Sequence, residues 1–121
     1  MIIKKFEEIQ AWKEARKLVK ELHHRFKDCR DFAFKDQIQR AGISTMSNIA
    51  EGFDRNSNKE FVNFLLIARG SCAEIKSLLY AALDVGYIEE NVFRSFYGQI
   101  SKVGGLINGF ISYLKSNSKP K

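Results

Sequence analysis

Six basic side chains recur between residues 13 and 27 at spacings that can gather them on one side of a helix. They are Lys13, Arg16, Lys17, Lys20, His24 and Lys27. Because each residue of an α-helix is rotated by about 100° from the one before it, all six fall within an arc of about 100°. We call this arc the basic flank. A row of cations about four turns long can contact nucleic-acid phosphates and displace their counterions, so the basic flank predicts phosphate binding.

The acidic residues of the same segment leave a second interpretation open. Glu14, Glu21 and Asp28 cluster beyond the basic flank, and the two glutamates can pair with Lys17 and His24 three residues further on. The segment would then be an ordinary solvated helix face. The formal net charge of +6 and the pI near 9.4 favour an anionic partner, with nucleic acid first. The same charge also keeps a small domain soluble.

Other kinds of reactive site have little support in the sequence. Glu21 and His24 have the Glu-x-x-His spacing of metal ligands in some bundles, but they fall on the polar side of the helix and no second such motif exists. Cys29 and Cys72 lie far apart on apolar faces, as is typical of reduced, buried thiols. The glycines follow no phosphate-loop spacing. The sequence therefore predicts no metal, no cofactor and no enzyme activity.

Four segments carry apolar residues at the three- and four-residue steps of a helix: 12–29, 38–53, 61–82 and 92–114. Ser57 and Glu60 form a capping box before the third segment, and Gly86 can end that helix in a left-handed conformation. Either Asp31 or Asp36 can cap the second helix. No stretch alternates between apolar and polar residues for long enough to predict a strand.

These features predict an all-α chain that folds as an antiparallel up-and-down four-helix bundle, because short connections make consecutive helices antiparallel neighbours. One domain should span residues 1–115, followed by a disordered polar tail over residues 116–121. The N-terminus lacks the apolar stretch of a signal peptide, and the apolar region 103–114 is too short to cross a bilayer. We therefore expect a cytoplasmic protein without a membrane contact.

The middle of the chain contains three motifs in a fixed order. They are Gln37-x-x-Arg40-Ala41, Ser47-Asn48-Ile49-Ala50-Glu51-Gly52 and Ala68-Arg69-Gly70-Ser71-x-x-Glu74. In this order and spacing they resemble the family of four-helix proteins encoded in intervening sequences of bacterial large-subunit ribosomal RNA genes. The resemblance begins at Phe6-Glu7-Glu8-Ile9 and continues to Gly86-Tyr87. The segment 92–114 matches in its apolar pattern alone, and with it the resemblance covers nearly the whole chain.

This resemblance implies an antiparallel four-helix bundle that assembles as a homopentameric ring and has no known catalytic residues. The family is related to the accessory protein of diversity-generating retroelements, a basic ring that binds nucleic acid and a reverse transcriptase. We therefore expect a basic homo-oligomeric scaffold for RNA or DNA. The alternative is a protein–protein adaptor for a nucleic-acid enzyme such as a reverse transcriptase.

The motif residues are predicted to form a structural polar network. A turn near Ser57 would bring Arg40 level with Glu74 on the next antiparallel helix, which predicts an interhelical ion pair that fixes the register. The network members are Arg40, Asn48, Glu51, Arg69, Ser71 and Glu74. A surface role is the alternative, in which Arg55 and Arg69 contact phosphate.

Glycines and aromatic residues leave further questions open. Gly52 and Gly70 each weaken a helix by about 1 kcal/mol, so close helix packing is predicted at both. Ser101, Gly105, Gly109 and Ser112 form a small-residue stripe that permits a close contact either within the protomer or between protomers. Five aromatic residues can serve an interface, stack on bases or cover the bundle ends: Tyr80, Tyr87, Phe93, Tyr97 and Tyr113.

Overall fold

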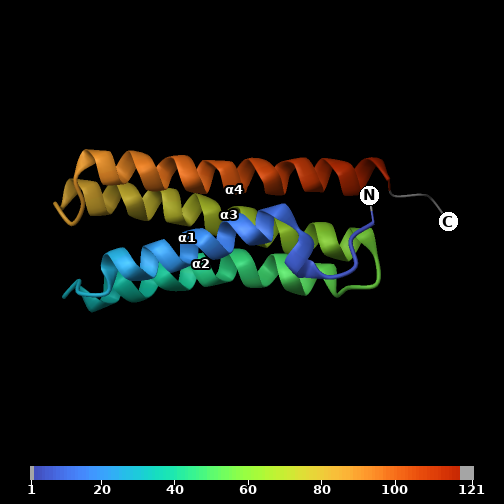
Figure 1. The fold of residues 1–121 in the computed structure, drawn as a ribbon, viewed down its shortest axis with the longest axis horizontal. Helices are drawn as coiled ribbons and strands as arrows, with labels where there is room; N and C mark the ends of the chain where they lie inside the picture. Colours follow the sequence, from blue (N-terminus) through green and yellow to red (C-terminus); the bar gives the residue numbers. More distant parts are fainter. Residues whose placement is uncertain (1, 118–121) are drawn as a thin grey trace.

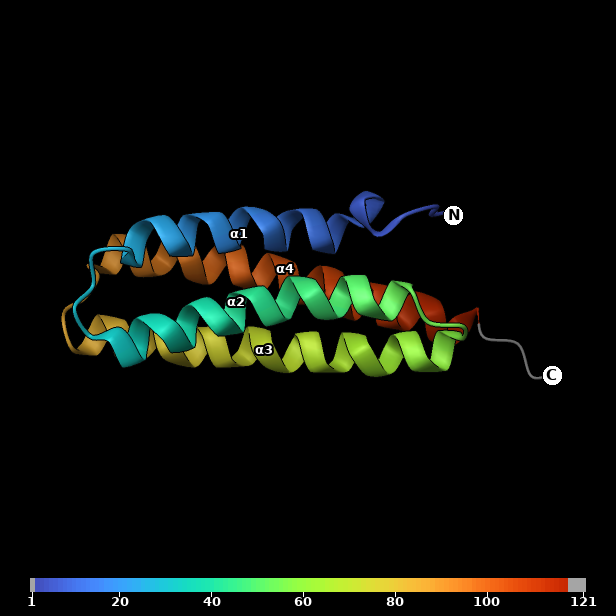
Figure 2. The same cartoon turned by 90° about the horizontal axis from the view of Figure 1, so that it is seen from below.

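A computed structural model describes residues 2–117, which form one short 3-10 helix and four long α-helices (Figure 1). They are η1 (Phe6–Glu8), α1 (Gln10–Phe26), α2 (Phe32–Phe53), α3 (Asn58–Asp84) and α4 (Glu90–Ser116). The turns after α1 and α3 lie at one end of the bundle, and the α2–α3 turn lies at the other end beside the N-terminal segment (Figures 1 and 2). No strand occurs within the described range. The prediction of an all-α, up-and-down antiparallel bundle is confirmed.

The helical part of the chain extends slightly beyond the predicted boundary at residue 115. Ser116 is the last residue of α4, and Asn117 follows as its C-cap. The Asn117 side-chain amide donates a hydrogen bond to the Tyr113 carbonyl over 2.8 Å. Residues 118–121, the rest of the predicted tail, lie outside the described residues.

Each α-helix turns one apolar stripe toward a common core. α1 packs against α2 and α4 and lies diagonally across the bundle from α3 (Figure 2). The largest fully buried side chains include Ile9, Leu18, Leu22, Ile38, Ile49, Leu65, Ile75, Leu79, Ile100 and Ile107. Their spacing within each helix follows the three- and four-residue steps. The periodicity that predicts the helices therefore also fixes which side of α1 faces solvent.

Side-chain caps fix where α2 and α3 begin. Asp31, and not Asp36, caps α2, because the Phe34 backbone N–H donates to Asp31 Oδ1 over 3.1 Å. Ser57 Oγ caps α3 by accepting from the Glu60 backbone N–H over 3.2 Å. The Ser57 hydroxyl also donates to the Glu60 carboxylate over 3.3 Å. The predicted capping box is therefore confirmed, with the carboxylate bonded to the hydroxyl instead of the backbone.

Gly86 ends α3 as predicted. Its φ of +84° lies in the left-handed region that favours glycine. The backbone N–H groups of Gly86 and Tyr87 donate to the carbonyls of Leu83 and Ala82 over 3.2 and 2.8 Å, the paired bonds typical of this helix ending. The turn directs the chain into α4.

A hydrogen bond joins the two loops at this end of the bundle. Tyr87 Oη donates to Asp31 Oδ2 over 2.6 Å, and the tyrosine ring packs edge-on against Phe34 at 5.3 Å between centroids. The bond from Tyr87, together with the bond from the Phe34 N–H, lowers the pKa of Asp31. The same bond raises the pKa of Tyr87, because ionisation would remove the donor beside a carboxylate.

We expect Tyr87→Phe to lower the melting temperature at neutral pH, because the variant keeps the ring and loses the donor. Folding lowers the pKa of Asp31, so the hydrogen bond stabilises the fold above the ordinary aspartate pKa, and this stabilisation is lost as pH falls through the lowered value. Folding raises the pKa of Tyr87, so the stabilisation is present below the ordinary tyrosine pKa and is lost as pH rises through the raised value. The melting temperatures of the wild type and the variant, measured between about pH 2 and pH 8, should converge at the acid end. A difference that stays constant with pH would contradict this account.

The two motif glycines differ in their surroundings. A Cβ atom on Gly52 would lie 2.7 Å from Phe61 Cδ1 and 2.8 Å from Phe64 Cβ, so α2 and α3 pack closely there. A Cβ atom on Gly70 would meet nothing within 4 Å. The predicted close packing is therefore confirmed at Gly52. It is wrong at Gly70, because that residue is exposed on α3.

Candidate nucleic-acid interface

All six residues of the basic flank are exposed on the solvent-facing side of α1. The opposite side of the helix is buried and consists of Ala11, Ala15, Leu18, Leu22 and Phe26. From Lys13 to Lys27 the flank extends for about 21 Å at the rise of an α-helix. The structure thus brings together the cations that the sequence places on one arc.

Lys17 is the member of the basic flank that has an ion-pair partner among residues 2–117. Its Nζ lies 3.6 Å from Glu14 Oε2, and its side chain is still 69% exposed. The Glu14 side chain is only 14% exposed, and its other oxygen lies 3.6 Å from Lys102 Nζ on α4. Partial burial opposes ionisation of Glu14, but the charges of Lys102 and Lys17 and the hydrogen bonds from Lys17 and Gln10 together lower its pKa. Most of the flank is therefore free to contact an external anion.

The acidic side of α1 is directed toward α4. Glu14 bridges to Lys102, and Glu21 Oε1 accepts a hydrogen bond from Gln99 Nε2 over 3.0 Å. Glu21 therefore bonds to α4 and leaves His24, its possible partner within α1, in solvent. Because both carboxylates interact with side chains of α4, they lie beside the basic flank and do not interrupt it.

Two neighbouring contacts enlarge the surface that the sequence predicts. The Arg16 guanidinium lies 5.7 Å from the centroid of the Trp12 ring, within the range of a cation–π contact. Lys35 Nζ donates to the Lys27 carbonyl over 3.1 Å and so adds a cation at the end of the flank. Sequence reasoning missed Lys35 because its position depends on the path of the α1–α2 loop, about which helical periodicity says nothing.

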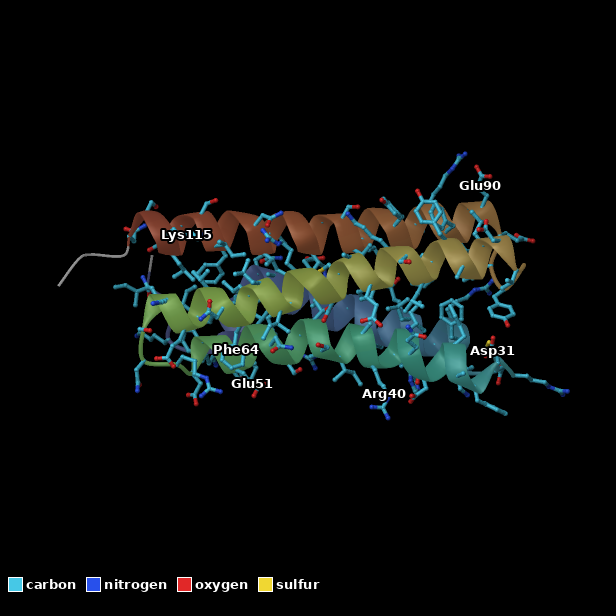
Figure 3. The ribbon with its side chains drawn as sticks, turned by 180° about the vertical axis from the view of Figure 1, so that it is seen from behind. Asp31, Arg40, Glu51, Phe64, Glu90 and Lys115 are labelled. Atoms are coloured by element: carbon cyan, nitrogen blue, oxygen red, sulfur yellow. The ribbon has the colours of Figure 1, made fainter. Side chains whose placement is uncertain are left out.

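The predicted polar network does not form as one unit, and the Arg40–Glu74 ion pair is absent. Arg40 Nε donates to Asp36 Oδ2 over 2.7 Å, one turn earlier on α2. Figure 3 shows Arg40 pointing away from α3. Glu74 accepts from Gln37 Nε2 over 3.3 Å. Arg40 is nearly level with Glu74, but it is turned about 60° around the helix from Gln37, toward solvent.

A smaller network does join α2 to α3. Ser44 Oγ and Ser71 Oγ are hydrogen-bonded over 2.9 Å. Asn48 Nδ2 donates to the Ser44 carbonyl over 2.8 Å and to its hydroxyl over 3.1 Å. Because Ser71 is buried, these bonds satisfy a polar group that would otherwise be costly to bury.

The other motif residues lie apart from this network. Arg69 Nη1 donates to Asn108 Oδ1 on α4 over 3.0 Å, which holds it in a contact between helices. The Glu51 side chain is exposed (Figure 3) and forms no hydrogen bond or ion pair within residues 2–117. The Arg55 guanidinium lies 4.5 Å from the centroid of the Phe64 ring and is exposed. Arg55 is thus better placed than Arg69 to meet a phosphate.

The glycines of α4 make no close helix contact within their own protomer. A Cβ atom on Gly98, Gly104, Gly105 or Gly109 would meet nothing within 4 Å. Gly105 and Gly109 line a groove of about 520 Å³, together with apolar side chains of α4 and the N-terminal segment. The stripe is therefore not used for packing within the protomer.

An aromatic cluster lies across α3 and α4. Tyr80 is 50% exposed, and its ring centroid lies 4.8 Å from that of Phe93 and 5.8 Å from that of Tyr97. Lys76 Nζ lies 5.2 Å from the Tyr97 ring centroid. Of the other aromatic candidates, Tyr87 bonds to the loop before α2, and Tyr113 lies at the opposite end of the bundle.

The groups suited to other chemistry are dispersed. Cys72 is buried, and burial raises the pKa of its thiol to about 11, which keeps it protonated and unreactive. Glu21 and His24 are both exposed. In the described part of the chain, no three His, Cys, Asp or Glu side chains are grouped so that they could hold a metal ion.

None of the helices within residues 2–117 combines enough length with enough hydropathy to cross a membrane.

Comparison with known proteins places this fold and these motifs in a family. The fold is similar to a crystal structure of a protein of unknown function from the S23 ribosomal protein family of Bacteroides thetaiotaomicron, with a TM-score of 0.74 and 24% sequence identity. That match covers 84% of this chain and 91% of the other. No curated protein matches the sequence. The family model of the 23S rRNA-intervening sequence proteins matches residues 7–109. The chain therefore belongs to the 23S rRNA-intervening sequence protein family.

Proposed function

We propose that this chain is a non-catalytic, basic, homo-oligomeric scaffold that binds RNA or DNA through backbone phosphates. The observation that carries the proposal is the exposure of the whole basic flank along one side of α1. Lysine and arginine side chains on such a surface neutralise phosphates without reading base sequence. The family description, which refers to an intervening sequence of ribosomal RNA, agrees with a nucleic-acid partner. We place the protein in the cytoplasm as part of the same proposal.

A gel-shift titration with duplex RNA and duplex DNA of about 20 bp tests the proposal. Binding through about five phosphate contacts should weaken by about 500-fold between 50 and 200 mM salt, because each contact releases condensed counterions. A shift at the lower salt concentration that is lost at the higher one is the expected result. The absence of any shift at low salt would contradict the proposal.

The proposal includes a ring of several copies, as the family resemblance implies. Glycine weakens a helix by about 1 kcal/mol relative to alanine, and the exposed glycines of α4 meet nothing in their own protomer. Close approach of a helix from a second copy gives them a physical role. The neighbouring groove, which Leu106 and Phe110 help to line, adds apolar surface for such a contact. A ring would also combine several basic flanks into one charged surface.

Light scattering tests this assembly. We expect the wild type to have about five times the protomer mass of 13.9 kDa, and the Gly105→Gln/Gly109→Gln variant to have the protomer mass. Both substitutions point into open space, so the fold should be retained. Gly70→Gln, on the exposed side of α3, is the matched control and should assemble normally. A monomeric wild type, or a double variant that still assembles, would contradict this interface.

The adaptor function is the second candidate, and the aromatic cluster of Tyr80, Phe93 and Tyr97 is the observation that favours it. Partly exposed tyrosine rings are typical of protein interfaces. Under this alternative, a nucleic-acid enzyme should co-purify with the chain after nuclease treatment and be lost from the Tyr80→Ala variant. Loss of the enzyme on nuclease treatment alone would favour the scaffold.

A further inference from the structure

A pocket of about 300 Å³ opens at the end of the bundle, where the α2–α3 turn meets the last turns of α4. The N-terminal segment passes the same end (Figures 1 and 2). No residue of the basic flank lines this pocket, so it is a separate feature of the molecule. Its volume is at the lower end of the range for small-ligand sites.

Four aromatic rings from α2, α3 and α4 build the apolar side of the pocket. Phe61 packs edge-on against Phe53 and Phe110, with centroids 6.1 and 5.1 Å apart. Tyr113 continues the row at 6.2 Å from Phe110. The Tyr113 ring is 37% exposed, so a planar ligand can reach it. Neighbouring rings hold these side chains in place, and rigid aromatic rings are the usual platform for an unstacked base.

Side-chain amides line the polar side of the pocket. Asn58 Nδ2 donates to the Leu114 carbonyl over 3.4 Å, and Asn117 Nδ2 donates to the Tyr113 carbonyl over 2.8 Å. The nitrogen of each amide donates in these bonds, whereas the two Oδ1 atoms have no donor among the described residues. Amide oxygens accept hydrogen bonds from the amino groups of bases. The wall therefore suits adenine and cytosine better than uracil.

Arg55 is the charged residue among those that line the pocket, and none of them is acidic. Its guanidinium packs over Phe64 and forms no ion pair within residues 2–117. A cation beside an aromatic pocket without carboxylates favours an anionic, planar ligand. A base attached to a phosphate has both properties.

We propose that this pocket binds one unstacked base, with its adjoining phosphate, from a single-stranded nucleic acid. The base stacks on Tyr113, its amino group donates to Asn58 and Asn117, and the phosphate contacts Arg55. The inference rests on the proposed function and deepens it. The basic flank contacts only phosphates, whereas the pocket requires a base.

Fluorescence anisotropy with two oligonucleotides of equal charge tests the proposal. One is oligoadenylate, and the other has the same phosphodiester backbone without bases. We expect the wild type to bind the base-bearing strand at least about fivefold more tightly, because stacking contributes only when a base is present. As a competitor for the bound strand, oligouridylate should be weaker than oligoadenylate. Equal affinity for the abasic and base-bearing strands would overturn the proposal and leave phosphate binding by the basic flank intact.

Pocket variants locate the effect. Tyr113→Ala should remove the preference for the base-bearing strand, and Arg55→Ala, which changes an exposed side chain, should weaken binding of that strand. Phe32→Ala, which removes an exposed aromatic ring outside the pocket, is the control and should keep the preference. A preference that survives both pocket variants would place the base elsewhere and overturn the assignment.

A mononucleotide titration separates failure of the pocket from failure of the flank. If neither strand binds at low salt, the proposed function fails, but adenosine monophosphate can still be added and the Tyr113 ring protons followed by NMR. A saturable shift that is absent in Arg55→Ala would support the pocket independently. Unchanged ring resonances would overturn it.

Discussion

Replacement of Lys13, Lys17, Lys20 and Lys27 by glutamine should weaken duplex binding by at least about a thousandfold at 50 mM salt. Each lysine that contacts a phosphate releases counterions, and at low salt this contributes about tenfold per contact. The four side chains are exposed, so their substitution should change the free energy of unfolding little. Anisotropy measurements of affinity, together with thermal melts, check both parts of the prediction.

The matched control removes the same amount of charge from other surfaces. Lys4, Lys5, Lys59 and Lys115 are exposed and lie outside the basic flank. Their replacement by glutamine should reduce affinity far less, because they lie away from the bound phosphates. Equal losses in the two variants would mean that net charge alone, and not the flank on α1, causes binding.

The second large effect is expected at Gly52. Gly52→Ala should lower the free energy of unfolding by about 1–3 kcal/mol, because the added Cβ would overlap Phe61 and Phe64 Cβ. Phe64 Cβ is attached directly to the backbone of α3, so the two helices must move apart to relieve the overlap. Urea denaturation measures the change.

Gly70→Ala is the matched control on the neighbouring helix. Its Cβ would enter open space, and alanine favours the helix, so this variant should be more stable by about 0.5–1 kcal/mol. A Gly52→Ala protein as stable as the wild type would contradict the close packing of α2 on α3. A destabilised Gly70→Ala protein would contradict the exposed position of Gly70.

The elements of the fold follow from local features of the sequence. Apolar residues at helical spacing predict all four α-helices, and Ser57 and Gly86 mark the start and end of α3 because each acts on residues within one turn. The same periodicity places the basic flank on the solvent side of α1, since the arc of cations is defined relative to the buried stripe. Local rules thus determine the elements and their faces.

Contacts between elements are where sequence reasoning was wrong or silent. Counting from the turn at Ser57 gives the level of Arg40 on the bundle, but the rotation of α2 decides whether it meets Glu74, and Gln37 occupies that position. The bond between Asp31 and Tyr87 joins residues 56 positions apart. It depends on how two loops meet, which helical periodicity does not describe.

The bundle-end pocket was not predictable for the same reason. Phe53 lies at the end of α2, whereas Phe110 and Asn117 lie at the end of α4, and none carries a motif that points to a ligand. The exposure of Gly105 likewise depends on the rotation of α4, which left the small-residue stripe open to two interpretations. The structure removes the first of them, because a Cβ on Gly105 would meet nothing in its own bundle; a contact between protomers stays a prediction.

Lysine footprinting tests most directly whether α1 contacts the polyanion. Acetylation of the protein with and without a saturating duplex, read by mass spectrometry, compares every lysine in one experiment. We expect protection at Lys13, Lys17, Lys20 and Lys27, with Lys59 and Lys115 modified equally in both samples. Equal modification of the α1 lysines with and without the duplex, or protection confined to α3 and α4, would contradict it.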